Sequence, residues 1–128
     1  MLSSTESEPT RLRASRGQAS VEFALALPIV VVMTIGLVLV AVAVRNELAV
    51  EFAAREGARA AAVSADHAAA ATTAAKRAVT LPIDVVTTSD HRTVTVTVTY
   101  VDPVDVAVIG KLIGPVTHAA SVTMMFEP

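Results

Sequence analysis

One long uncharged stretch constrains this chain more than any other feature. Residues 23–44, FALALPIVVVMTIGLVLVAVAV, are 22 consecutive residues without a charged side chain. At about 1.5 Å per residue, a helix of this length crosses a hydrocarbon layer of about 30 Å. Pro28 and Gly36 are common in membrane helices, and the Thr34 hydroxyl can bond back to the helix backbone. The stretch therefore predicts a transmembrane helix.

Glu22 lies directly before this apolar stretch. A carboxylate costs about 2.5–3.5 kcal/mol at the centre of a membrane helix, and less near the interface. Two interpretations are open at this point. Glu22 is either an interfacial residue, solvated by headgroups and paired with Arg16, or an acid whose task requires a partner.

The spacing around Glu22 favours a task. Residues 16–23, RGQASVEF, place a glycine five positions before an acid and an aromatic residue, and a long apolar helix follows. This pattern resembles the processing site of type IV prepilins. More narrowly, RGQASVEFALALP together with AAREGARAAA (residues 53–62) resembles the TadE-like family of tight-adherence (Flp-type) pilus assembly proteins, and the resemblance covers residues 16–63.

The resemblance implies that a prepilin peptidase cuts after Gly17, so that Gln18 becomes the first residue of the mature chain. Glycine suits such a site because it lets a protease grip an extended backbone. The new ammonium group of Gln18 would offset the charge of Glu22 on the same or a neighbouring subunit. Glu22 and Phe23 would then set the register of assembly. The implied role is that of a minor pilin or pseudopilin, whose partners are other pilins or pseudopilins and the pilus assembly platform.

Charges on either side of the stretch predict its orientation. Arg11, Arg13 and Arg16 precede it closely, whereas Arg45 is the one basic residue immediately after it. The positive-inside rule then keeps the N-terminus in the cytoplasm and exports the rest of this single-pass protein. After processing, the chain could also reach a surface filament.

Two other fates of the N-terminal region stay open. A secretory signal has an apolar core of about 7–15 residues followed by a small-x-small cleavage site. The apolar stretch here is 22 residues long, and Val44-Arg45-Asn46 offers no such site. The second alternative is an uncleaved signal anchor that presents a small extracytoplasmic binding domain.

The sequence predicts three regions: a basic leader at 1–17, a transmembrane helix with a prepilin-like start at 18–44, and one small exported α+β domain at 45–128. The leader is polar and without apolar periodicity, which predicts disorder. From residue 45 the helix should continue, with Glu51 and Arg55 as a favourable ion pair and Leu48 and Phe52 as an apolar ridge.

Alanine then provides 12 of the 21 residues from Ala58 to Ala78. This segment predicts either a solvated spacer helix or a small-residue surface, with Gly57, on which long helices pack in an assembly. Ser64 or Asp66 could cap a second helix that ends before Pro82.

The last third of the chain predicts a small antiparallel sheet. A first strand at 83–88 and a turn at 89–92 precede residues 93–100, TVTVTVTY, which alternate between threonine and an apolar residue. A short helix should follow Asp102-Pro103 and end at Gly114-Pro115, although its valines also suit a strand. A last strand is expected at 116–126. The fold class is thus α+β, with a long N-terminal helix packed on a small sheet, as in pilin-like proteins.

Composition and spacing give no sign of catalysis or of a cofactor. A formal charge of −2 does not favour nucleic acid, and the absence of cysteine excludes disulfides. His67, His91 and His118 fall in three different predicted elements, so each is expected at the surface or in a turn and not as a metal ligand. The chain resembles the substrate of a processing enzyme and is not itself expected to be an enzyme. A third possibility is a small exported enzyme or carrier with a pocket between helix and sheet, which would bind a ligand as a fragment beginning near Arg45.

Overall fold

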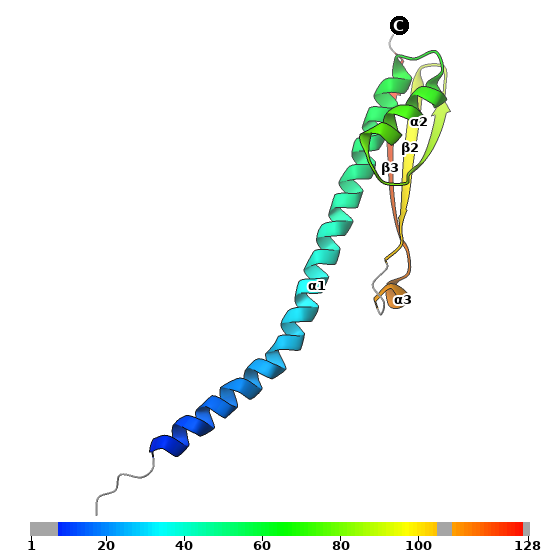
Figure 1. Ribbon diagram of the computed structural model, residues 1–128. Helices are drawn as coiled ribbons and strands as arrows, with labels where there is room; N and C mark the ends of the chain where they lie inside the picture. Colours follow the sequence, from blue (N-terminus) through cyan, green and yellow to red (C-terminus); the bar gives the residue numbers. More distant parts are fainter. Residues whose placement is uncertain (1–7, 105–108, 127–128) are drawn as a thin grey trace, which may run out of the picture. The chain divides into compact units, whose positions relative to one another are not determined.

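The computed structural model describes residues 8–104 and 109–126, arranged as α1-α2-β1-β2-α3-β3 (Figure 1). Helix α1 runs from Glu8 to Ala62 and contains 55 residues. The chain divides into two compact units, Met1–Ala41 and Val42–Pro128, and each is described here by itself. A long N-terminal helix followed by a small antiparallel sheet makes this an α+β protein, as predicted.

The first unit consists of the N-terminal part of α1. It includes most of the uncharged stretch, and the most apolar window of the helix has no buried residue. Pro28 lies within the helix, and the Thr34 hydroxyl donates a hydrogen bond to the Val30 carbonyl at 2.8 Å, as expected from the sequence. One long, apolar, unburied helix is consistent with a single-pass membrane protein.

The predicted disorder of the leader is wrong for residues 8–17, which belong to α1. Pro9 occupies the first turn, where its missing N–H leaves no helical hydrogen bond unmade. The following residues are mostly good helix formers, and they extend a helix that already exists. Extending an existing helix costs much less free energy per residue than nucleating a new one. A polar segment joined to a stable helix can therefore be helical. Residues 1–7 lie outside the described part of the chain.

The second unit contains the C-terminal part of α1 and a second helix, α2 (His67–Ala78). Asp66 caps α2, because its carboxylate accepts a hydrogen bond from the Ala69 N–H at 3.1 Å. Lys76 and Arg77 occupy the last turn, where cations are favoured. The predicted cap at Asp66 is confirmed.

Three strands form one antiparallel sheet in the order β1-β2-β3, with bounds Asp84–Ser89, Thr93–Asp102 and Val116–Met125. Strand β2 is central, pairing Val98 with Val85 on one side and with Ala120 on the other. The predicted turn between β1 and β2 is present, closed by a 2.8 Å hydrogen bond from the Asp90 N–H to the Thr93 carbonyl.

The core lies between the helices and the valine face of β2. Val94, Val96 and Val98 are fully buried. A Cβ placed on Gly57 would lie 3.1 Å from a Val96 methyl group and 3.1 Å from the Ala71 carbonyl oxygen, so α1 approaches both β2 and α2 closely at this glycine. The other fully buried small residues of the two helices are Ala53, Ala54, Ala58, Ala61, Ala71 and Ala75.

This packing corrects the interpretation of the alanine-rich segment as a solvated spacer. Ala58, Ala61, Ala62, Ala71 and Ala75 form the inner face of α1 and α2 and bring the helix backbones close to the sheet of the same chain. Other alanines of the segment are exposed, among them Ala65, Ala68 and Ala69, so packing against neighbouring helices stays a prediction. Alanine buries little apolar area per residue. The stability of this unit therefore depends on many close van der Waals contacts between the helices and the sheet.

The predicted helix between β2 and β3 is shorter than expected. Helix α3 comprises Ile109–Ile113, and residues 105–108 lie outside the described part. It ends at Gly114, which has a φ of 72°, a left-handed conformation that favours glycine.

Candidate processing site and membrane-proximal contacts

Gly17, the predicted scissile residue, lies within helix α1. It is exposed, and a Cβ added there would have no other heavy atom within 4 Å. A protease that binds extended backbone would therefore have to unwind this part of the helix. Glycine favours unwinding, since it is about 1 kcal/mol less stable than alanine in a helix.

Gln18 and Glu22 lie one turn apart on the same face of α1. The Gln18 side-chain amide donates a hydrogen bond to the Glu22 carboxylate over 3.4 Å. Arg16 precedes Glu22 by six residues, which places the two side chains about 240° apart around the helix. Within the described residues, no ion pair joins Arg16 to Glu22. Phe23 is 70% exposed.

The basic residues of the leader are also on α1. Arg13 and Arg16 are exposed, whereas the structure describes the backbone but not the side chain of Arg11. All three therefore precede the uncharged stretch on one continuous helix.

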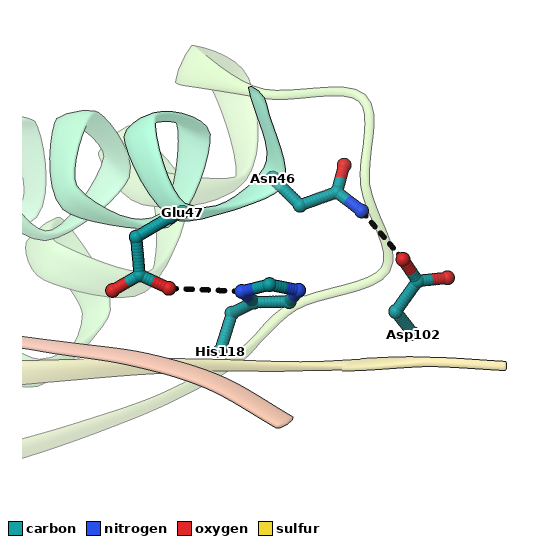
Figure 2. A network of polar contacts seen from close by, with 4 residues as sticks. All are labelled: Asn46, Glu47, Asp102 and His118. Atoms are coloured by element: carbon teal, nitrogen blue, oxygen red, sulfur yellow. Dashed lines mark hydrogen bonds and ion pairs between the residues drawn. The ribbon is translucent and has the colours of Figure 1, made fainter. Parts of the chain in front are cut away.

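A second group of polar residues lies just past the uncharged stretch, where α1 meets the end of β2. The Asn46 amide on α1 donates a hydrogen bond to the Asp102 carboxylate on β2 at 2.7 Å (Figure 2). Asn46 is only 7% exposed. A hydrogen bond to a carboxylate from a buried amide stabilises more than a neutral one, so this contact fixes the end of β2 to α1.

The neighbouring residue on α1 reaches β3. Glu47 Oε2 lies 2.8 Å from His118 Nδ1, and His118 is 5% exposed (Figure 2). A carboxylate only accepts hydrogen bonds, so Nδ1 carries the proton in this contact. The His118 ring also stacks on Tyr100, with ring centroids 6.3 Å apart. Its Nε2 is buried without a hydrogen-bond partner in the described chain.

This group was not predicted from the sequence, and the prediction that His118 lies at the surface or in a turn is wrong. The alternation of β3 contains the missing signal: His118, Ala120, Val122 and Met124 share one face of the strand, and that face is turned to the core. On α1, Asn46 has the helical spacing of Val50, Ala53 and Gly57, which are all buried. His67 is also partly buried, with Nδ1 at 2.7 Å from the Ala61 carbonyl oxygen.

The face of α1 opposite the sheet carries an exposed apolar ridge, formed by Val44, Leu48 and Phe52. These side chains are 54%, 60% and 52% exposed and recur every four residues, so the ridge continues the apolar stretch beyond its end. Beside it, Arg55 and Glu51 form the predicted ion pair. Both partners are substantially exposed, so the pair contributes little to stability.

The space between α1 and the sheet is filled by the buried core. Among the residues described, no three histidine, aspartate or glutamate side chains lie together as metal ligands would.

An apolar N-terminal helix that continues into a small helix-on-sheet domain defines an α+β class that is consistent with a single-pass membrane protein. Within this class, residues 17–59 match the family of TadE-like proteins. The match begins at Gly17, covers Glu22 and the uncharged stretch, and ends before the sheet. The resemblance read from the sequence is thus confirmed over these residues, and the family implies involvement in assembly of a tight-adherence (Tad) pilus. No curated protein and no solved structure matches the chain.

Proposed function

We propose that this protein is a minor pilin or pseudopilin of a tight-adherence pilus, matured by a prepilin peptidase that cleaves after Gly17. The observation that carries the proposal is the order of Gly17, Gln18 and Glu22 at the start of an apolar helix, together with a TadE-like match that begins at Gly17. The protein acts as a substrate of the peptidase and a subunit in assembly, and not as an enzyme.

The geometry of α1 supports this role. Cleavage creates an ammonium group on Gln18, one helical turn from Glu22 on the same face. In a membrane, that positive charge lowers the cost of the carboxylate in its own chain or in an adjacent subunit. The arginines before Gly17 keep the peptidase site on the cytoplasmic side, and the α+β domain is exported.

The exposed ridge of Val44, Leu48 and Phe52 provides a surface for other pilins or pseudopilins. It lies on the side of α1 that the sheet leaves uncovered, directly after the apolar stretch. A neighbouring α1 that packs along the span would reach this ridge without displacing the sheet.

The test is the intact mass of the full chain, purified from membranes with and without co-expressed prepilin peptidase. Processing removes the 17 residues from Met1 to Gly17 and leaves Gln18 at the N-terminus. Gly17→Leu should abolish the mass change. Gly36→Leu is the matched control, because Gly36 also lies in α1 and its added Cβ would likewise meet nothing within 4 Å.

A mature N-terminus other than Gln18 overturns the proposed cleavage. A chain that keeps its full mass with active peptidase, while a known prepilin in the same cells is cut, supports the second candidate. That candidate is an uncleaved membrane anchor for a small binding domain, and the folded, sheet-containing unit beyond the span favours it.

A further inference from the structure

The connection between β2 and β3 carries apolar side chains that no part of the described chain covers. Leu112 is 82% exposed and Ile113 is 61% exposed, both on α3. Lys111 precedes them and is also exposed. Exposure of two adjacent large apolar side chains to water is unfavourable, which indicates that another surface covers them.

The described part of the connection, residues 103–104 and 109–115, has a defined geometry. A Cβ on Gly110 would lie 2.0 Å from the Val104 carbonyl oxygen, so only glycine fits there. At the other end, the Gly114 N–H donates a hydrogen bond to the Gly110 carbonyl at 3.1 Å, and Gly114 has a left-handed φ. These two glycines fold Lys111, Leu112 and Ile113 into one tight turn.

Contacts within the second unit give the direction in which this turn projects. The His67 ring, just past the C-terminal end of α1, lies 4.5 Å from the Phe126 ring, and the Phe126 N–H bonds to the Arg92 carbonyl beside the start of β2. The other end of β2, Asp102, contacts Asn46. Strand β2 therefore runs antiparallel to α1. Its last residue, Asp102, lies beside Asn46, which is two residues after Val44, the last residue of the uncharged stretch.

Within the second unit, α3 therefore lies past the level of Asn46, toward the end of the unit at which its part of α1 begins at Val42. Figure 1 shows α3 beyond the paired ends of β2 and β3. We propose that Leu112 and Ile113 insert into the interface of the bilayer that α1 spans, giving the exported domain a second membrane contact. Lys111 would lie among the phosphates of the headgroups.

A lipid surface fits this patch better than a protein does. A stable protein interface buries about 1,200–2,000 Å² in total, whereas this patch consists of two side chains on a single turn. An apolar pair with an adjacent lysine, at the depth of the membrane boundary, is the composition of an interfacial anchor. The inference requires that residues 23–44 span the membrane, and it is independent of any role in a pilus.

The test uses the natural absence of cysteine in the full chain. Single variants Leu112→Cys, Met125→Cys and Val32→Cys are labelled with an environment-sensitive fluorophore and placed in lipid nanodiscs, one chain per disc. Met125 is the matched control, because it is 78% exposed and ends the strand that begins beside α3. Val32 reports the span itself. Quenching is measured with brominated lipids and with aqueous iodide.

Leu112 should resemble Val32, with strong quenching by brominated lipid and weak quenching by iodide, and Met125 should show the opposite. If Val32 is quenched by lipid but Leu112 is open to iodide, the span stands and the interfacial contact is overturned. A Leu112 label protected from both quenchers is covered by protein, which also overturns it. If Val32 itself is not quenched by lipid, the membrane span fails and the inference fails with it.

Discussion

Nδ1 of His118 on β3 lies 2.8 Å from Oε2 of Glu47 on α1, across 71 residues of sequence. This contact and the neighbouring bond between Asn46 and Asp102 join the helix to the two longest strands. Both lie within three residues of Val44, so they hold the sheet at the point where α1 leaves its apolar stretch. The remaining contact between helix and sheet is apolar and made largely by small side chains.

We expect His118→Ala to destabilise the unit that contains the sheet by about 1–3 kcal/mol, because it removes a buried ring and leaves a cavity beside Tyr100 and Glu47. Glu47→Ala should cost less than about 1 kcal/mol, since the Glu47 side chain is 57% exposed. Tyr100 is the only tyrosine of a chain that has no tryptophan, and it stacks on His118, so its fluorescence reports unfolding in denaturant.

The matched control is Thr117→Ala, an exposed neighbour of His118 on the opposite face of β3, which should change stability by less than about 0.5 kcal/mol. A His118→Ala variant as stable as Thr117→Ala would contradict a structural role for the buried ring.

We expect Asn46→Leu to loosen the end of β2 at Asp102. The substitution leaves the Asp102 carboxylate without its buried donor, which costs about 1–3 kcal/mol. Hydrogen exchange should accelerate at residues 100–102 and stay unchanged near Val94, at the other end of the strand. Arg45→Ala, an exposed neighbour on α1, is the control. Uniform acceleration along the whole of β2 would mean that Asn46 supports global stability and is not a local attachment.

Part of this structure was predicted from the sequence, and these polar contacts were not. The Thr-Val alternation at 93–100 predicts β2 and its buried face, because one period-2 pattern determines both. The uncharged stretch similarly predicts the helix around it. Asn46 and His118 were missed because hydrophobic periodicity counts polar residues as exposed, and only the pairing of distant elements provides their partners.

The helix at residues 8–17 and the burial of alanines against the sheet were not predicted, for a related reason. Both outcomes depend on other parts of the chain. Residues 8–17 extend an existing helix, and the buried small residues of α1 and α2 pack against a sheet that lies later in the sequence. The candidate processing residues, in contrast, were identified by resemblance, and cleavage after Gly17 stays a prediction.

We expect Gly57→Leu to destabilise the domain by about 1–3 kcal/mol or more, because any side chain there presses against the Ala71 carbonyl and Val96. The loss occurs although leucine has a higher helix propensity than glycine. Arg59→Leu, two residues further on an exposed face, should have little effect. Tyr100 fluorescence in denaturant compares the two variants. Equal stability would show that α1 and α2 can separate at Gly57 without cost.

The last prediction concerns Glu22. A carboxylate at the start of an apolar helix is best tolerated in the stagger of adjacent helices that brings an ammonium group beside it, so it selects one register against the others. We expect Glu22→Leu to insert in the membrane and keep a folded α+β domain, but to lower the number of assembled pili by about tenfold or more, the equivalent of about 1.4 kcal/mol. Pili are counted by electron microscopy in cells that express the variant at the wild-type level.

Glu22→Gln separates charge from shape, because glutamine keeps the size of the side chain and a hydrogen-bonding group for Gln18. If the charge determines register, Glu22→Gln assembles as poorly as Glu22→Leu, and Glu22→Asp recovers part of the function. If Glu22→Gln assembles normally while Glu22→Leu does not, the hydrogen bond matters and the charge does not. Should both variants mature and assemble like the wild type, Glu22 is an interfacial residue, and α1 then serves as a membrane anchor without a register function.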